Sequence, residues 1–167
     1  MAVFRESGVA DDAALALLTE YFSARAESFP AGPEAYRTVF PSPDDFVPPR
    51  GVFLIVEGED LAGDAADVGC GGIRRIAPSD TGAARFEIKH LYVQPHTRGT
   101  GLGAALLAEL ERRAVELGAD EVVLDTNASL EAAGRLYARA GYRPIEPYND
   151  NPNATNWYGK DVQAEAQ

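Results

Sequence analysis

The sequence of 167 residues has a single cysteine, Cys70, and two histidines. One cysteine cannot form an internal disulfide, and neither a cysteine cage nor a histidine cluster is available to ligate a metal ion. We therefore expect no metal. A chain built without disulfides suits a reducing compartment, so the expected location is cytoplasmic.

Long apolar runs and excess positive charge are also lacking. The longest clearly apolar run covers residues 52–56, which is too short to cross a membrane, and no signal-peptide core is found at the N-terminus. Lys and Arg number 15 against 26 Asp and Glu, a formal net charge of -11. Because nucleic-acid binding depends on a basic face, we expect neither a membrane nor a nucleic acid as a partner.

The remaining composition is that of an ordinary globular chain, with 46% hydrophobic and 25% charged residues. The length predicts a single domain over residues 1–167. Periodicity and turn residues predict helices at residues 13–26, 33–40, 102–117 and 130–140, and strands at residues 3–7, 52–57, 67–76, 84–93, 122–126 and around Trp157. A meander followed by alternating strands and helices indicates an α+β or mixed α/β domain.

The most informative segment lies between the strand that ends at Val93 and the long helix that follows it. Gly99, Gly101 and Gly103 alternate there, so that backbone amides can approach a ligand without interference from Cβ atoms. The free amides and the helix dipole attract an anion, and Arg98 adds a permanent positive charge. The segment predicts a polyphosphate site, although glycines in such a place can also simply shape a tight helix entry.

Two other phosphate-binding motifs also place glycines between a strand and a helix. A Walker-type P-loop is excluded because no Lys-Ser or Lys-Thr follows them. A dinucleotide fingerprint fits better, with Gly99-x-Gly101-x-x-Ala104 and Asp125 at the end of the next strand. Against it, the glycines begin well after Val93, and too few residues follow Asp125 to build a doubly wound sheet.

With these residues in view, the segment resembles the GNAT superfamily of N-acetyltransferases. Arg98-x-x-Gly101-x-Gly103, preceded by Tyr92-Val93-x-Pro95, is similar to that family's acetyl-CoA pyrophosphate motif, and Leu136-Tyr137-x-x-x-Gly141-Tyr142 is similar to its second signature. The resemblance covers residues 84–160. It implies a mostly antiparallel, partly splayed sheet of about six or seven strands with helices on both faces.

The resemblance also implies acetyl-CoA as cosubstrate, with the pyrophosphate held by the amides of residues 98–103. The pantetheine arm would pair with the edge of residues 91–93, provided that this strand splays from residues 122–126. Where the family often has Asn, this chain has Leu130, and Asn127 is expected to cap the helix instead. The expected cofactor-binding residues are Leu91, Tyr92, Val93, Arg98, Gly99, Thr100, Gly101, Leu102, Gly103, Ala104 and Asn127.

Acetyl transfer to an amine needs a neutral amine and a proton for the leaving thiolate. A primary amine with a pKa of about 10.4 is almost fully protonated at neutral pH, so a base is useful. Glu87, on a strand expected to be buried on both faces, is the candidate base, with an ion pair to Lys89 or Arg85 or a solvated edge position as the alternatives. Tyr137 points inward from the last helix; on spacing alone it is a core residue, and the resemblance makes it the acid that protonates the CoA sulfur.

The acceptor side is expected at Phe22, Phe29 and Phe46, which either line a pocket mouth or belong to the core, and at the polar loop of residues 148–152. The acidic composition suggests a cationic acceptor. We expect direct transfer to a small primary amine in a ternary complex. The alternatives are a non-catalytic CoA-binding sensor or interaction module and a dinucleotide-binding oxidoreductase, and family habit suggests a homodimer.

Overall fold

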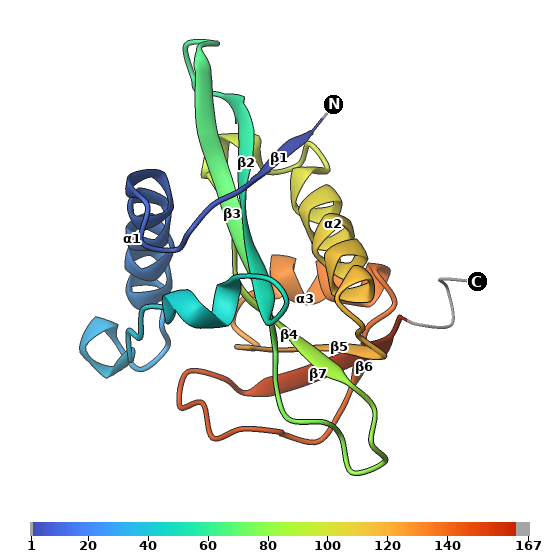
Figure 1. Cartoon of the computed structure of the whole chain (residues 1–167). Helices are drawn as coiled ribbons and strands as arrows, with labels where there is room; N and C mark the ends of the chain where they lie inside the picture. The colour runs from blue at the N-terminus through green and yellow to red at the C-terminus, as the bar shows by residue number, and fades with distance from the viewer. Residues whose placement is uncertain (1, 163–167) are drawn as a thin grey trace.

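The computed structural model describes residues 2–162, in which seven strands form one sheet accompanied by three α-helices (Figure 1). The strands are β1 Val3–Glu6, β2 Gly51–Glu59, β3 Ala65–Arg75, β4 Arg85–Val93, β5 Glu121–Thr126, β6 Arg143–Pro144 and β7 Asn156–Asp161; the helices are α1 Asp12–Glu27, α2 Leu102–Glu116 and α3 Glu131–Arg139. No helix in this range is long and apolar enough to cross a bilayer.

The strand order is β1-β2-β3-β4-β5-β7-β6, and every neighbouring pair is antiparallel except β4 and β5. This arrangement confirms the expected mixed, mostly antiparallel sheet. It also contradicts the dinucleotide-binding alternative, because β5 is followed in the sheet by the antiparallel β7 rather than by further parallel strands.

Helices cover both faces of the sheet, with α1 on one side of β2 and β3 and α2 on the other (Figure 1). The side chains of β2 alternate between the two layers, as the two-residue period of a strand requires. Leu54 and Val56 pack in the core that contains α2, whereas Phe53 and Ile55 pack in the core that contains α1. This explains why the central run of β2 is apolar at every position.

The parallel pair β4 and β5 is joined over three residues, Arg85–Glu87 against Glu121–Val123, and the strands separate beyond them. A bulge in β4 accompanies the separation: Lys89 pairs with Gly72 and Tyr92 with Cys70, so two residues of β4 oppose one of β3. His90, inside the bulge, has a φ of 58°, a left-handed conformation that is uncommon outside glycine. The predicted splay is thus present, with a bulge beside it.

The segment between α1 and β2 differs from the prediction. The helix expected over residues 33–40 is reduced to one 3-10 turn, Pro33–Ala35, and the proline-rich loop contains a second turn, Pro43–Phe46. Aromatic packing competes with helix formation here, since Tyr36 lies 5.5 Å from Phe29 and Phe40 lies 4.8 Å from Phe22 between ring centres. These contacts draw the segment over the sheet instead of letting it continue as a helix.

Candidate functional site

The glycine segment forms an open cradle at the start of α2. Gly99 and Gly101 have φ values of 83° and 84°, and a Cβ placed on either would meet no atom within 4 Å. After Arg98, the next amide with a backbone acceptor is that of Ala105, which donates to Gly101 O at 3.0 Å. The amides of residues 99–104 therefore have no hydrogen-bond acceptor within residues 2–162, and Arg98 beside them is exposed. Leu102, Gly103 and Ala104 form the first turn of the helix and supply three of these amides.

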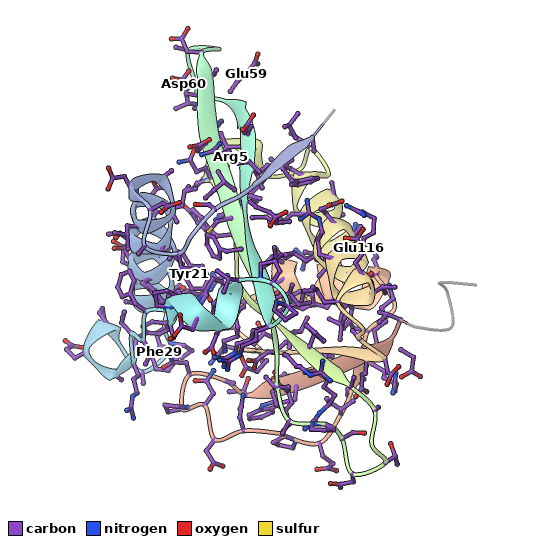
Figure 2. All side chains as sticks on the ribbon, viewed as in Figure 1. Arg5, Tyr21, Phe29, Glu59, Asp60 and Glu116 are labelled. Carbon is purple, nitrogen blue, oxygen red and sulfur yellow. The ribbon has the colours of Figure 1, made fainter. Side chains whose placement is uncertain are left out.

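A cavity of about 500 Å³ occupies the space where β4 and β5 separate. Its two walls are residues 88–91 of β4 and residues 124–126 of β5 with the following Asn127, and Tyr137 of α3 closes one side. The opposite side is formed by α1 and the segment that follows it, including Tyr21 and Phe29, which are labelled in Figure 2. The chain leaves the cavity along the end of β4, makes the 3-10 turn Pro95–Thr97 and then forms the cradle at the start of α2.

Leu91 and Tyr92 of β4 have different surroundings. Leu91 lines the cavity. The side chain of Tyr92 turns to the other face of the sheet, where its hydroxyl donates to Glu20 Oε1 at 3.2 Å. Val93 pairs with Gly69 of β3 at the end of β4. For Tyr92, contact with a ligand in the splay is therefore restricted to its backbone.

Tyr137 is buried, with 7% of its surface exposed, and lines the cavity. Burial raises the pKa of its phenol well above the usual value, and the charge of Arg25 opposes that rise more weakly. The hydroxyl consequently stays protonated at neutral pH. It is a group that can donate a proton inside the splay.

Glu87 is 1% exposed, and both of its oxygens have partners. Oε1 accepts hydrogen bonds from Arg74, whose Nη2 lies at 2.9 Å, and Oε2 accepts one from the Tyr148 hydroxyl at 2.7 Å. Lys89 Nζ lies 3.8 Å from Oε2. Arg74 and Lys89 line the cavity, while Glu87 lies behind them. Of the two ion pairs considered from the sequence, the one with Lys89 is present, and Arg85 instead lies over the Tyr148 ring at 5.6 Å.

Asn127 does not cap α3. The residue at the N-cap of that helix is Leu130, which makes no side-chain cap hydrogen bond. Asn127 accepts from the Ser129 amide at 3.0 Å and donates from Nδ2 to Asn153 O at 3.1 Å. The Asn127 side-chain oxygen is therefore used within the turn between β5 and α3 and is not free to cap the helix. The Asn127 Nδ2 group connects the cavity wall to the β6–β7 loop.

The loop between β6 and β7 forms the roof of the cavity together with the segment after α1. Asn149 and Asn151 line the cavity, as the sequence predicted for this polar loop, and so do Phe22, Phe29 and Phe46. Asn153 joins the two segments: its Oδ1 accepts from the Arg37 amide at 3.0 Å and its Nδ2 donates to Arg37 O at 2.7 Å. The roof is thus held by hydrogen bonds from one side chain to the backbone of a segment that is far away in sequence.

His90 lines the cavity but was not expected there. Its ring is packed by the rings of Tyr21, Phe22 and Phe46, and its Nδ1 is buried with no hydrogen-bond partner within residues 2–162. Burial lowers the pKa of His90 to about 3, with the charges of Lys89 and Arg74 acting in the same direction. The imidazole is therefore neutral. No signal in the sequence could have revealed it, because the bulge determines where the side chain points.

Four charged side chains that were not predicted for the site also line the cavity. They are Arg25, Arg37, Asp45 and Asp125, and for Asp125 the sequence suggested only the role of a ribose ligand. In the part of the chain that the structure describes, no group of three or more His, Cys, Asp or Glu residues could hold a metal ion.

The amino-acid sequence is similar to those of known proteins. A model of the acetyltransferase (GNAT) family matches residues 14–142. The chain is 37% identical over 105 residues to an uncharacterized N-acetyltransferase of Schizosaccharomyces pombe, a match that covers 63% of this chain and 60% of that protein. It is 42% identical over 57 residues to the aminoalkylphosphonate N-acetyltransferase of Salmonella typhimurium, covering 34% of this chain and 37% of that protein. The matched part thus spans less than two thirds of these relatives.

Solved structures match over a larger share of the chain. An acetyltransferase from Streptococcus agalactiae superposes with a TM-score of 0.70 at 18% identity, covering 96% of this chain and 98% of that one. A phosphinothricin acetyltransferase from Sinorhizobium meliloti, solved in complex with AcCoA, superposes with a TM-score of 0.61 at 18% identity, covering 96% and 88% of the two chains. At this identity the likeness concerns the fold.

Proposed function

The chain belongs to the acetyltransferase (GNAT) family, and on that premise we propose that it transfers an acetyl group from acetyl-CoA to a small primary amine. The observation that carries the proposal is the order of two features along one stretch of chain: residues 88–91 of β4 line the cavity where β5 separates, and residues 98–104 then form the cradle at the start of α2. An elongated thioester with a diphosphate at one end fits this order. A small acceptor is supported by the relative whose name specifies aminoalkylphosphonate.

The residues present fit acetyl-CoA. Open amides at residues 99–104 and the guanidinium of Arg98 suit its diphosphate. The backbone of residues 91–93 would pair with the amides of the pantetheine arm, because β5 has already left β4 at this point. Acetyl-CoA would supply the thioester carbonyl, placed in the cavity near Tyr137.

The transfer needs no covalent enzyme intermediate. The neutral amine attacks the thioester carbonyl, a C–N bond forms, and the C–S bond breaks. Tyr137 is the proposed donor of the proton that the leaving thiolate takes up, and the proton that the nitrogen loses as the amide forms returns to the Tyr137 oxygen. Glu87 is the proposed acceptor of the ammonium proton, through water and not by direct contact, because Arg74 and Lys89 stand between its carboxylate and the cavity.

Calorimetry and turnover together test the proposal. Titration with acetyl-CoA should give binding while titration with NAD gives none. Release of free CoA thiol should then be measured over a panel of amino acids, aminophosphonates, polyamines, aminoglycosides and peptides, with at least one small amine acetylated. Binding of acetyl-CoA with no acetylation of any amine would support the sensor alternative, which uses the cradle but not Tyr137 or Glu87.

A further inference from the structure

Some of the charged side chains that line the cavity form ion pairs within the described residues, and others do not. Of its four cationic residues, Arg74 bonds to Glu87 and Asp45, and Lys89 lies 3.6 Å from Asp125. The other two, Arg25 and Arg37, have no carboxylate within 4.0 Å in the part of the chain that the structure describes.

The two acids of the lining have partners. Asp45 bonds to Arg50 and Arg74, while Asp125 accepts a hydrogen bond from Asn149 at 2.8 Å and lies near Lys89. Among the residues that the structure describes, the cavity therefore presents two guanidinium groups without a paired carboxylate and no carboxylate without a paired cation. This contrasts with the chain as a whole, whose net charge is -11.

Arg25 is directed toward the inside of the cavity. Its guanidinium carbon lies 5.0 Å from the centre of the Tyr21 ring, one turn earlier on α1, and Tyr21 itself lines the cavity. Burial raises the pKa values of Tyr36 and Tyr137, and the positive charge of Arg25 opposes that rise at both phenols. The stack on Tyr21 restricts the guanidinium to a small region.

Arg37 stands on the roof, where its backbone is fixed. The two hydrogen bonds with Asn153 hold both the amide and the carbonyl of Arg37, although the side chain has no such partner. A long side chain that starts from a fixed point over a cavity can reach a ligand at a lower entropic cost than one on a free loop. Phe29, Tyr36 and Phe40 supply apolar surface around it.

We propose that the acceptor carries an anionic oxygen group, a carboxylate or a phosphonate, in addition to its amine, and that Arg25 and Arg37 bind this group. The proposal rests on the proposed acetyl transfer and specifies its substrate class. Guanidinium groups pair with such oxygens through charge-assisted hydrogen bonds, which are strongest where water is partly excluded. The expectation of a cationic acceptor, which came from bulk charge, is replaced by one based on the local charges of the cavity.

The diphosphate of acetyl-CoA is a poor alternative occupant for these two arginines. Residues 98–104, which form the cradle, are not part of the cavity lining, and Arg98 already serves that end of the site. A polycationic acceptor is disfavoured as well, because it would meet two unpaired guanidinium groups, and the acids nearby are already paired.

Matched acceptors test the proposal by turnover. Phenylalanine should be compared with 2-phenylethylamine, and 2-aminoethylphosphonate with ethanolamine, so that each pair differs in one anionic group. We expect kcat/KM to favour the anionic member by about tenfold or more. Arg25→Gln and Arg37→Gln should each raise KM for the anionic acceptors by about tenfold relative to KM for the neutral-tailed amines.

Arg75→Gln is the control. Arg75 is exposed, lies over the Phe86 ring at 5.8 Å and is outside the cavity lining, so the substitution removes the same charge and the same kind of ring contact. It should leave the preference for anionic acceptors intact. Variants of Arg25 and Arg37 that both keep the wild-type ratio of KM between neutral and anionic acceptors would overturn the proposal, whatever their kcat.

A binding measurement that needs no turnover completes the test. In the presence of CoA, 3-phenylpropionate should bind more tightly than its neutral amide, and Arg25→Gln with Arg37→Gln should abolish the difference. If acetyl-CoA binds and 2-phenylethylamine or spermidine is preferred, the anion proposal fails while acetyl transfer stands. If acetyl-CoA itself does not bind, the proposed function fails first.

Discussion

The hydroxyl of Tyr148 donates a hydrogen bond of 2.7 Å to Oε2 of Glu87, across 61 residues of sequence. Together with Arg74 on Oε1, this bond holds a carboxylate that is 1% exposed. Three elements are thereby joined, namely β3, β4 and the loop between β6 and β7. Any proton that reaches Glu87 must do so within this arrangement, so the chemical and structural roles of the residue have to be separated by experiment.

Glu87→Gln should lower kcat on the order of 10²-fold, because the amide cannot accept a proton. The measurement is the rate of acetylation with a saturating amine. Tyr148→Phe is the control, since it removes one hydrogen bond of the carboxylate but keeps its charge, and its kcat should change little. Unchanged turnover in Glu87→Gln with a lower melting temperature would assign the residue to structure alone.

Tyr137→Phe should lower kcat by about 10²-fold while the affinity for acetyl-CoA, measured by calorimetry, stays the same. The ring and its packing are kept, and only the proton donor is removed. Tyr142→Phe is a matched control: its ring lies 6.0 Å from that of Tyr137, and its hydroxyl donates to Glu111 outside the cavity. Equal losses of activity in the two variants would indicate a general effect on packing.

Gly101→Ala should raise the Kd for acetyl-CoA by at least about tenfold. Alanine is strained at a φ of 84°, and its Cβ would enter the open space in front of the cradle amides. Gly63→Ala provides the comparison, because Gly63 has a φ of 88° and equally open surroundings far from the cradle. Both substitutions should cost about 1–2 kcal/mol of stability, and only the first should weaken binding. Equal Kd values for the two variants would contradict the cradle.

Acid stability should depend on His90. Its pKa is lowered to about 3 in the folded chain, so between the usual value of 6.5 and 3 the unfolded state binds more protons than the folded state. The free energy of unfolding is therefore unaffected by this group above pH 6.5 and decreases as the pH falls below that value, by about 2 kcal/mol at pH 5.

Urea unfolding at pH 7 and pH 5 measures this loss. His90→Asn, which tolerates the left-handed backbone, should remove most of the pH dependence between these two values, whatever its effect at pH 7. His96→Asn should retain the pH dependence, since His96 is exposed. If the two variants lose stability equally on acidification, the buried imidazole is not its source.

The local features of the fold and the cradle could be predicted because they depend on neighbouring residues. The alternating glycines before the apolar stripe of α2, and the apolar run of β2, carry their geometry in their spacing. Aromatic contacts overrode the same reasoning in residues 33–40, where a helix was expected. The intrinsic helix propensity of a segment contributes only a small free energy, and the aromatic contacts outweigh it in these residues.

The sequence by itself determined the tight glycine turn before α2, most of the strands and helices in their order, and the inward position of Tyr137. Only the tertiary structure decided what surrounds Glu87, where His90 points and which arginines of the cavity lack a counter-charge. The reason is physical: amide geometry and periodicity act over a few residues, whereas ion pairs such as Arg74 with Glu87 and roof contacts such as Arg37 with Asn153 join segments that meet only when the sheet has formed.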